Sequence, residues 1–259
     1  MRPRIPARGE RSRSTCEQSS TRTRVRERVV RVQGVDARGR APFWVAEIED
    51  GELVDLHAAG DLDAALAADD EVATIAVDVP LGHEDPRGES DGWRACDVAA
   101  REVLGEAGER FFVLPPPAVF ATDTYHEALA MCRERGWPKL EAALWFAADR
   151  LAALADRAGR DQRLVEVHPE VSFAHMGAGR RPPEHYGSSW AALDERLERL
   201  HGEGLHPEEV EPADHDPRPA LDACAAAWTA HRVSRGQARR LPGDPPSDPR
   251  TGRLVAVHA

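Results

Sequence analysis

The amino-acid sequence predicts a mixed α/β domain, and three observations lead to this class. Short runs rich in Val and Ile, bounded by Gly, Pro or Asp, alternate with longer Ala-rich stretches that have helical spacing. The 259 residues are enough to bury a full core in one large domain or two small ones. A composition of 41% hydrophobic and 31% charged residues is typical of a soluble globular protein.

The segments that follow residue 28 predict a strand meander, a short helix and a fourth strand. Asp50-Gly51 is a strong signal for a two-residue hairpin turn between the second and third strands. Pro80 and Gly82 end the fourth strand and open a loop. We expect strands over residues 28–35, 43–48, 51–57 and 72–79, and a helix over residues 62–68.

The rest of the chain is predicted to be mainly helical. Residues 114–117 include three consecutive prolines and are expected to be extended. Thr122 or Asp123 is a suitable N-cap for the helix that follows. We expect helices over residues 91–105, 122–135, 140–158, 189–200 and 220–235, a fifth strand over 164–167 and a last edge strand over 254–257.

This order of elements is the one with which RNase H-like folds begin. Three strands in a meander, a helix and a strand parallel to the first fit that fold, although they also fit other α/β folds. We therefore expect a five-stranded mixed sheet flanked by helices over residues 29–259. A helical insertion is expected between the fourth and fifth strands.

Charge divides the chain into a basic start and an acidic body. Residues 1–32 contain ten Arg and three Glu, whereas the whole chain has a formal net charge of −11. We expect residues 1–28 to be a disordered basic tail; an over-extended start codon and a nucleic-acid-binding arm are the alternatives. The acidic body has no broad basic face, which disfavours tight binding of a long nucleic acid.

Several classes of protein are disfavoured by the composition. No apolar run approaches the ~20 residues of a membrane span, and the basic start lacks the apolar stretch of a secretory signal, so a cytoplasmic protein without a membrane partner is expected. The four cysteines contain no CxxC pair, so buried free thiols are favoured over structural zinc or disulfides.

Four acidic residues stand where the predicted fold can bring them together. Asp36 ends the first strand, Asp78 ends the fourth, Glu166 lies in the fifth and Asp222 is in the C-terminal helix. Carboxylates at the ends of neighbouring strands, with one from a packed helix, are how proteins bind Mg²⁺ or Mn²⁺. The pattern therefore predicts a divalent-metal site.

Each of these acids also has a structural interpretation. Asp36 could cap a turn, and Asp78 could be a strand-end turn residue, although a charge that closes so apolar a strand is costly unless paired. Asp222 could be stabilised by the dipole of its helix, and Glu166 could pair with an arginine.

Five sequence runs, in this order, resemble the domain-of-unknown-function family DUF429 over about residues 29–258. They are Gly34-Val35-Asp36, residues 77–82 (VDVPLG), residues 94–101 (RACDVAAR), residues 166–170 (EVHPE) and residues 221–228 (LDACAAAW). The resemblance implies an RNase H-like fold and a predicted nuclease activity. Nucleic acid or a small phosphodiester would be the substrate.

The resemblance also implies roles for individual residues. Asp36, Asp78 and Asp222 would bind two Mg²⁺ or Mn²⁺ ions and, with Glu166, form the catalytic site for two-metal hydrolysis. His168 would face the site as a proton shuttle or phosphate donor.

Arg94 and Arg101 would bind a substrate phosphate with support from Asp97; the alternative for them is a solvated ladder of ion pairs. For the chain as a whole, the alternatives are a nucleotide-binding or phosphotransfer protein on the same sheet, disfavoured by the poor Gly-rich loop, and a non-catalytic scaffold.

Overall fold

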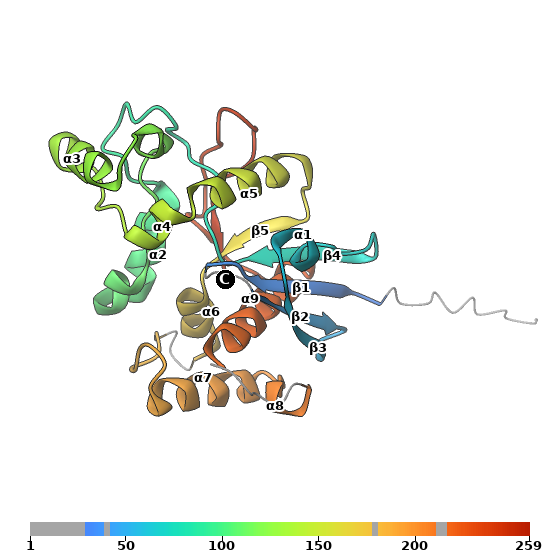
Figure 1. Cartoon of the computed structure of the whole chain (residues 1–259). Coiled ribbons are helices and arrows are strands. Elements are labelled where there is room, and N and C mark those ends of the chain that lie inside the picture. Colours follow the sequence, from blue (N-terminus) through green and yellow to red (C-terminus); the bar gives the residue numbers. More distant parts are fainter. Residues whose placement is uncertain (1–28, 39–41, 178–180, 211–216) are drawn as a thin grey trace, which may run out of the picture.

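The structure is a computed structural model that describes residues 29–38, 42–177, 181–210 and 217–259 (Figure 1). Within these residues the chain forms a mixed α/β fold around a seven-stranded sheet of order β3-β2-β1-β4-β5-β7-β6. Strand β1 pairs with β2 antiparallel and with β4 parallel, and β5 continues the parallel part of the sheet. The predicted basic tail of residues 1–28 lies outside the described residues.

The sheet is larger than the five strands predicted. Its strands are β1 Arg31–Asp36, β2 Phe43–Glu49, β3 Glu52–Ala59, β4 Val72–Val77, β5 Leu164–Val167, β6 Arg240–Leu241 and β7 Val257–His258. The predicted edge strand over residues 254–257 is wrong in position, because β7 pairs with β5 on one side and with β6 on the other. Strand β6 has two residues, too few for any periodic pattern in the sequence.

Helices occupy the connections, and the predicted insertion between the fourth and fifth strands is present. Between β4 and β5 lie α2 Ala95–Leu104, η1 Gly105–Arg110, η2 Pro117–Ala121, α3 Tyr125–Arg135, α4 Ala142–Phe146 and α5 Ala148–Arg160. The other helices are α1 Leu62–Ala65, α6 Pro169–Met176, α7 Trp190–Gly202, α8 Pro207–Val210 and α9 Arg218–Ser234. No helix among the described residues is long and apolar enough to cross a membrane.

Three local predictions can be compared with the structure. The hairpin turn is confirmed, because Asp50 and Gly51 both have positive φ, at 52° and 99°, as a type I′ turn requires. The predicted helix over residues 140–158 is two helices that meet at Ala147. Pro117, predicted to be extended, is the first residue of the 3-10 helix η2, a position where the missing amide hydrogen costs little.

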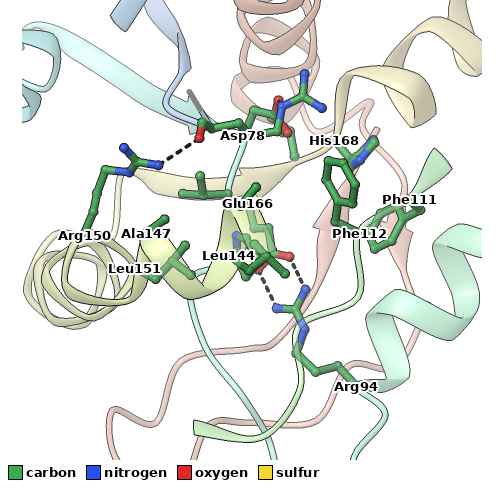
Figure 2. A pocket seen from close by; sticks show the side chains of 15 residues that line it. Asp78, Arg94, Phe111, Phe112, Leu144, Ala147, Arg150, Leu151, Glu166 and His168 are labelled. Atoms are coloured by element: carbon green, nitrogen blue, oxygen red, sulfur yellow. Dashed lines mark hydrogen bonds and ion pairs between the residues drawn. The ribbon is translucent and has the colours of Figure 1, made fainter. Parts of the chain in front are cut away.

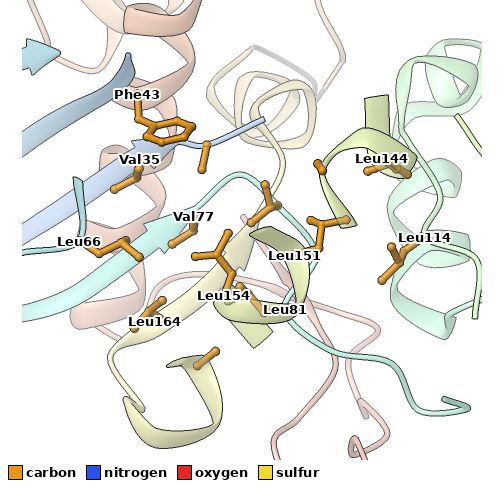
Figure 3. Packing of buried hydrophobic residues seen from close by; sticks show 14 of the residues in the cluster. Val35, Phe43, Leu66, Val77, Leu81, Leu114, Leu144, Leu151, Leu154 and Leu164 are labelled. Carbon is orange, nitrogen blue, oxygen red and sulfur yellow. The ribbon is translucent and has the colours of Figure 1, made fainter. Parts of the chain in front are cut away.

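Apolar side chains cover both faces of the sheet. On one face Val35, Val77 and Leu164 pack against Leu151 and Leu154 of α5 (Figure 3). On the opposite face α9 packs across β1, β2 and β4 with its run of small residues. The sheet is therefore enclosed between α5 and α9, which lie on opposite sides of it in Figure 1.

Gly34 determines how closely α9 approaches the sheet. A Cβ atom on this residue would lie 2.0 Å from the backbone nitrogen of Ala227 and 2.3 Å from the carbonyl oxygen of Ala223. Any side chain at position 34 would therefore push α9 away from β1. The close contact places Asp222, the neighbour of Ala223, beside the end of β1.

Candidate functional site

Three of the four predicted acids converge at one edge of the sheet. Asp36 is the last residue of β1, Asp78 directly follows β4, and Asp222 lies in the second turn of α9. Because β1 and β4 are parallel neighbours, their carboxyl ends lie at the same edge. All three side chains are buried, which makes their charges costly unless a cation or a proton compensates them.

The compensating cation is Arg38, two residues beyond β1. Its Nη2 atom donates to Asp222 Oδ2 at 2.5 Å, its Nε atom pairs with Asp78, and the same Nε lies 3.8 Å from Asp36 Oδ1. The backbone amide of Arg38 also donates to Asp36 Oδ1 at 3.1 Å. One guanidinium therefore occupies the space among the three carboxylates.

Sequence reasoning assigned no role to Arg38. The available signal was its position, because a cation two residues after a strand-end acid can fold back over that acid. Only the fold shows that the same cation also reaches Asp78 and Asp222.

The protonation of the cluster follows from burial and from the crowding of like charges. Burial, and then the neighbouring Asp36 and Asp222 carboxylates, raise the pKa of Asp78 well above its ordinary value, while Arg38 opposes the rise. Burial likewise raises the pKa of Asp36. For Arg38, burial lowers the pKa, but the three carboxylates outweigh it and raise the pKa overall.

Some buried carboxylate oxygens at this site lack a donor. Asp222 Oδ1 accepts no hydrogen bond from the described residues, and Arg196 Nε is 3.8 Å from it. Glu170 Oε2 at the start of α6 is similarly unbonded within the described part of the chain, with Arg110 Nη1 at 3.7 Å. These oxygens retain free lone pairs, which a bound cation could use.

Two hollows meet at Arg38. The smaller, of about 50 Å³, is mainly apolar and is drawn in Figure 2. The larger, of about 260 Å³, has both charged and aromatic side chains in its lining and is more open to solvent. Arg38 and Phe112 line both hollows. The smaller is also lined by Asp78, Phe111, Leu144, Leu151 and His168, and the larger by Asp36, Tyr186, Arg218, Pro219 and Asp222.

His168 lines the smaller hollow and has an unusual environment. The residue is buried and its ring stacks on Phe111 with centroids 4.4 Å apart (Figure 2). Neither ring nitrogen forms a hydrogen bond with any described residue. Burial, together with the charges of Arg38 and Arg218, lowers the pKa of His168 well below its ordinary value, so the ring is neutral at neutral pH.

Glu166 does not join the three aspartates, because Arg94 neutralises it separately. Glu166 Oε1 accepts from Arg94 Nη2 at 2.7 Å, and Oε2 accepts from Arg94 Nη1 at 3.0 Å and from the Leu81 amide at 2.8 Å. Figure 2 shows this pair on the far side of the hollow from Asp78. The arginine partner considered as the structural interpretation of Glu166 is thus present.

The predicted role of Arg94 in binding a substrate phosphate does not fit the structure. All five of its N–H donors are engaged: Nε and Nη2 bond Asp97, Nη1 bonds the Gly82 carbonyl, and Nη1 and Nη2 bond Glu166. The side chain is fully buried, so it forms no solvated ladder either. Arg101 contacts the Phe111 carbonyl and the Trp93 ring and lines neither hollow.

Comparison with known protein families gives a match over most of the chain. The family model described as a protein of unknown function, DUF429, matches residues 34–247, which include the three aspartates, Glu166 and His168. No curated protein and no solved structure matches the chain.

Proposed function

Since the chain belongs to the DUF429 family, whose description gives no activity, we propose a function from the site itself: divalent-metal-dependent hydrolysis of phosphodiester bonds. The observation that carries this proposal is the convergence of three buried aspartates on one cation, Arg38, at the edge of the sheet.

The donor set suits Mg²⁺ or Mn²⁺. Both ions prefer carboxylate oxygen, and Asp36, Asp78 and Asp222 provide it from two strands and a helix. The free lone pairs of Asp222 Oδ1 and the presence of a guanidinium among the acids both indicate that this space attracts a cation. When bound, the metal would activate water and stabilise the oxygen that leaves the phosphorus atom.

The first five strands of the sheet support an RNase H-like interpretation of the fold. Their spatial order is β3-β2-β1-β4-β5, with an antiparallel meander on one side of β1 and parallel pairing on the other. In this interpretation β6 and β7 extend the sheet beyond the common part. The acidic edge then corresponds to the place where that fold carries its carboxylates.

Arg38 would change partner when metal binds. The guanidinium would give up its place to a metal ion held by the aspartates, because both require the same carboxylate oxygens. The displaced side chain remains at the junction of the two hollows, where a planar fork of N–H donors suits a phosphate. Arg38 would therefore neutralise the acids in the free protein and bind the substrate phosphate in the loaded one.

His168 would serve proton transfer in the same site. A neutral imidazole with two unbonded nitrogens can accept a proton at one nitrogen and donate a hydrogen bond from the other. Its position at the end of β5, stacked on Phe111, holds the ring at the wall of the hollow.

A small phosphodiester or a short single strand is the substrate class that we favour. The net charge of −11 opposes the approach of a long polyanion. The larger hollow, of about 260 Å³, is of a size for one or two substituents around a phosphate rather than for a duplex.

A non-catalytic role is the second candidate, and one observation favours it. Arg196 and Arg218 also lie within 4 Å of Asp222, at 3.8 and 3.7 Å, so arginines surround this acid even without metal. In that case the aspartates and arginines form a permanent network that closes the edge of the sheet. Metal binding separates the two candidates.

The decisive experiment measures Mn²⁺ and Mg²⁺ binding by calorimetry and cleavage of DNA, RNA and model phosphodiesters with and without metal. We expect Asp36→Asn and Asp78→Asn to fold, to lose metal binding by at least about 100-fold and to lose cleavage, because each removes a charged ligand. Asp156→Asn, an exposed change on α5, is the matched control and should behave as wild type. Wild-type protein that binds neither ion would refute the metal-dependent activity.

A further inference from the structure

A second group of metal-ligating side chains lies at the turn between α7 and α8. His201 Nε2 lies 2.7 Å from Glu208 Oε1, and His206 Nδ1 lies 3.9 Å from the same oxygen. One ligand atom from each of these three residues lies within 4.8 Å of the others. We call His201, His206 and Glu208 the turn cluster.

The local backbone explains why the three side chains meet. His201 is in the last turn of α7, and Gly204, with a φ of +80°, reverses the chain immediately after it. The Leu205 amide returns to the Leu200 carbonyl at 2.9 Å, which fixes the turn. His206 directly precedes α8 and Glu208 is the second residue of that helix, so both side chains lie close to His201.

The three side chains of the turn cluster direct possible metal-ligating atoms toward one another. The two imidazole rings stack with centroids 4.8 Å apart and an angle of 25° between them. Within the described residues Glu208 pairs with these two histidines and with no arginine or lysine. His201 Nε2 is buried and, despite its short distance to Glu208, has no hydrogen bond of acceptable geometry in the described part of the chain.

We propose that the turn cluster binds a divalent transition-metal ion, with Zn²⁺ as the best fit. Two imidazole nitrogens and one carboxylate oxygen are a common Zn²⁺ ligand set, whereas Mg²⁺ prefers oxygen alone. The three side chains are about one-third to one-half exposed, at 35%, 45% and 48%, so an ion can enter and water can complete the coordination. The binding links the end of α7 to α8.

The turn cluster is separate from the site formed by Asp36, Asp78 and Asp222. The turn cluster lies at the end of α7 and the start of α8, whereas the aspartates lie in β1, directly after β4 and in α9. The two sites also differ in ligand chemistry, because one offers imidazole nitrogen and the other offers only carboxylate oxygen. Each proposal can therefore fail without the other.

The test is titration of the full chain, free of any histidine tag, with ZnCl₂ by calorimetry in excess Mg²⁺. We expect one tight equivalent of Zn²⁺ in wild type and in Asp78→Asn. His201→Gln and His206→Gln should each weaken that equivalent by at least about 10–100-fold, since loss of even an outer partner of a metal ligand costs this much. The melting temperature should rise with Zn²⁺ in wild type and not in these two variants.

His57→Gln is the matched control, because His57 is a partly exposed histidine paired to one carboxylate, Asp55, at 2.9 Å. This variant should bind Zn²⁺ as wild type does. Equal Zn²⁺ binding in wild type, His201→Gln and His206→Gln would overturn the proposal, as would absence of a tight equivalent in wild type. Loss of Zn²⁺ binding in Asp78→Asn but not in the histidine variants would place the ion among the aspartates instead.

Discussion

Two buried clusters of charge lie on opposite sides of one small hollow, and they differ in how completely they are closed. In the Arg94 cluster (Arg94, Asp97, Glu166), every guanidinium donor has a partner and the arginine is fully buried. In the Arg38 cluster (Arg38, Asp36, Asp78, Asp222), the arginine side chain is 21% exposed and lines both hollows.

The difference separates a structural ion pair from an exchangeable one. Arg94 joins the start of α2 to β5 and to the loop after β4, so its removal leaves two buried acids without a cation. Arg38 follows the end of β1 and is partly exposed to solvent, so in our proposal another cation can replace it. Similar residue types therefore support stability in one cluster and, in our proposal, ligand binding in the other.

The largest expected effect is a loss of stability when the Arg94 cluster is disrupted. Arg94→Met should lower the free energy of unfolding by about 3–5 kcal/mol, because it leaves Asp97 and Glu166 buried without their partner. Urea denaturation measures the change, and Arg101→Met on the same helix is the control. A loss below about 1 kcal/mol for Arg94→Met would show that the two clusters do not differ in this way.

A smaller effect, a gain in metal affinity, is expected in the Arg38 cluster. Arg38→Gln should raise Mn²⁺ affinity about tenfold, equivalent to about 1.4 kcal/mol, because it removes the cation that competes for the aspartates. Calorimetry measures this change, with Arg157→Gln on α5 as the control. Unchanged or weaker Mn²⁺ binding would mean that Arg38 does not occupy the metal position.

The last expected effect, of at most similar size per pH unit, is a dependence of Mn²⁺ affinity on pH. Asp78 has a raised pKa because of burial and of its acidic neighbours, so it keeps its proton above its ordinary pKa of 3.8. Metal must displace that proton, so Mn²⁺ affinity should rise with pH by up to about tenfold per unit and level off above the raised pKa.

Metal-free stability should change in the opposite direction. The folded chain binds more protons than the unfolded chain above pH 3.8, so the contribution of Asp78 falls as pH rises. Over a pH series, calorimetry tests the expected rise in Mn²⁺ affinity, and urea denaturation tests the expected fall in the free energy of unfolding. If the Asp78→Asn variant keeps the full pH dependence of stability, another group causes that dependence.

Short-range patterns in the sequence predicted the part of the fold that carries the site. The β-branched runs of β1, β4 and β5 and the Ala-rich α9 were recognisable, and so were the acids that follow or occupy them. The break at Ala147 and the two-residue β6 were not, because neither has enough residues to show a period.

The partner of each acid depended on contacts between distant segments. Arg94 and Glu166 come from opposite ends of the insertion, and no local pattern indicates that they meet. The role of Arg38 was equally hidden, because its partners Asp78 and Asp222 come from β4 and α9. Local sequence patterns identified the acids, but only tertiary structure divides them between the two clusters.

The contact between Gly34 and α9 has a consequence for the chain during its synthesis. Strand β1 emerges from the ribosome well before α9, and the two must pack directly for Asp222 to reach Asp36. A nascent chain therefore carries only two of the three aspartates and cannot complete the cluster. In our proposal, the ability to bind metal and to cut a phosphodiester would appear only after α9 has been synthesised.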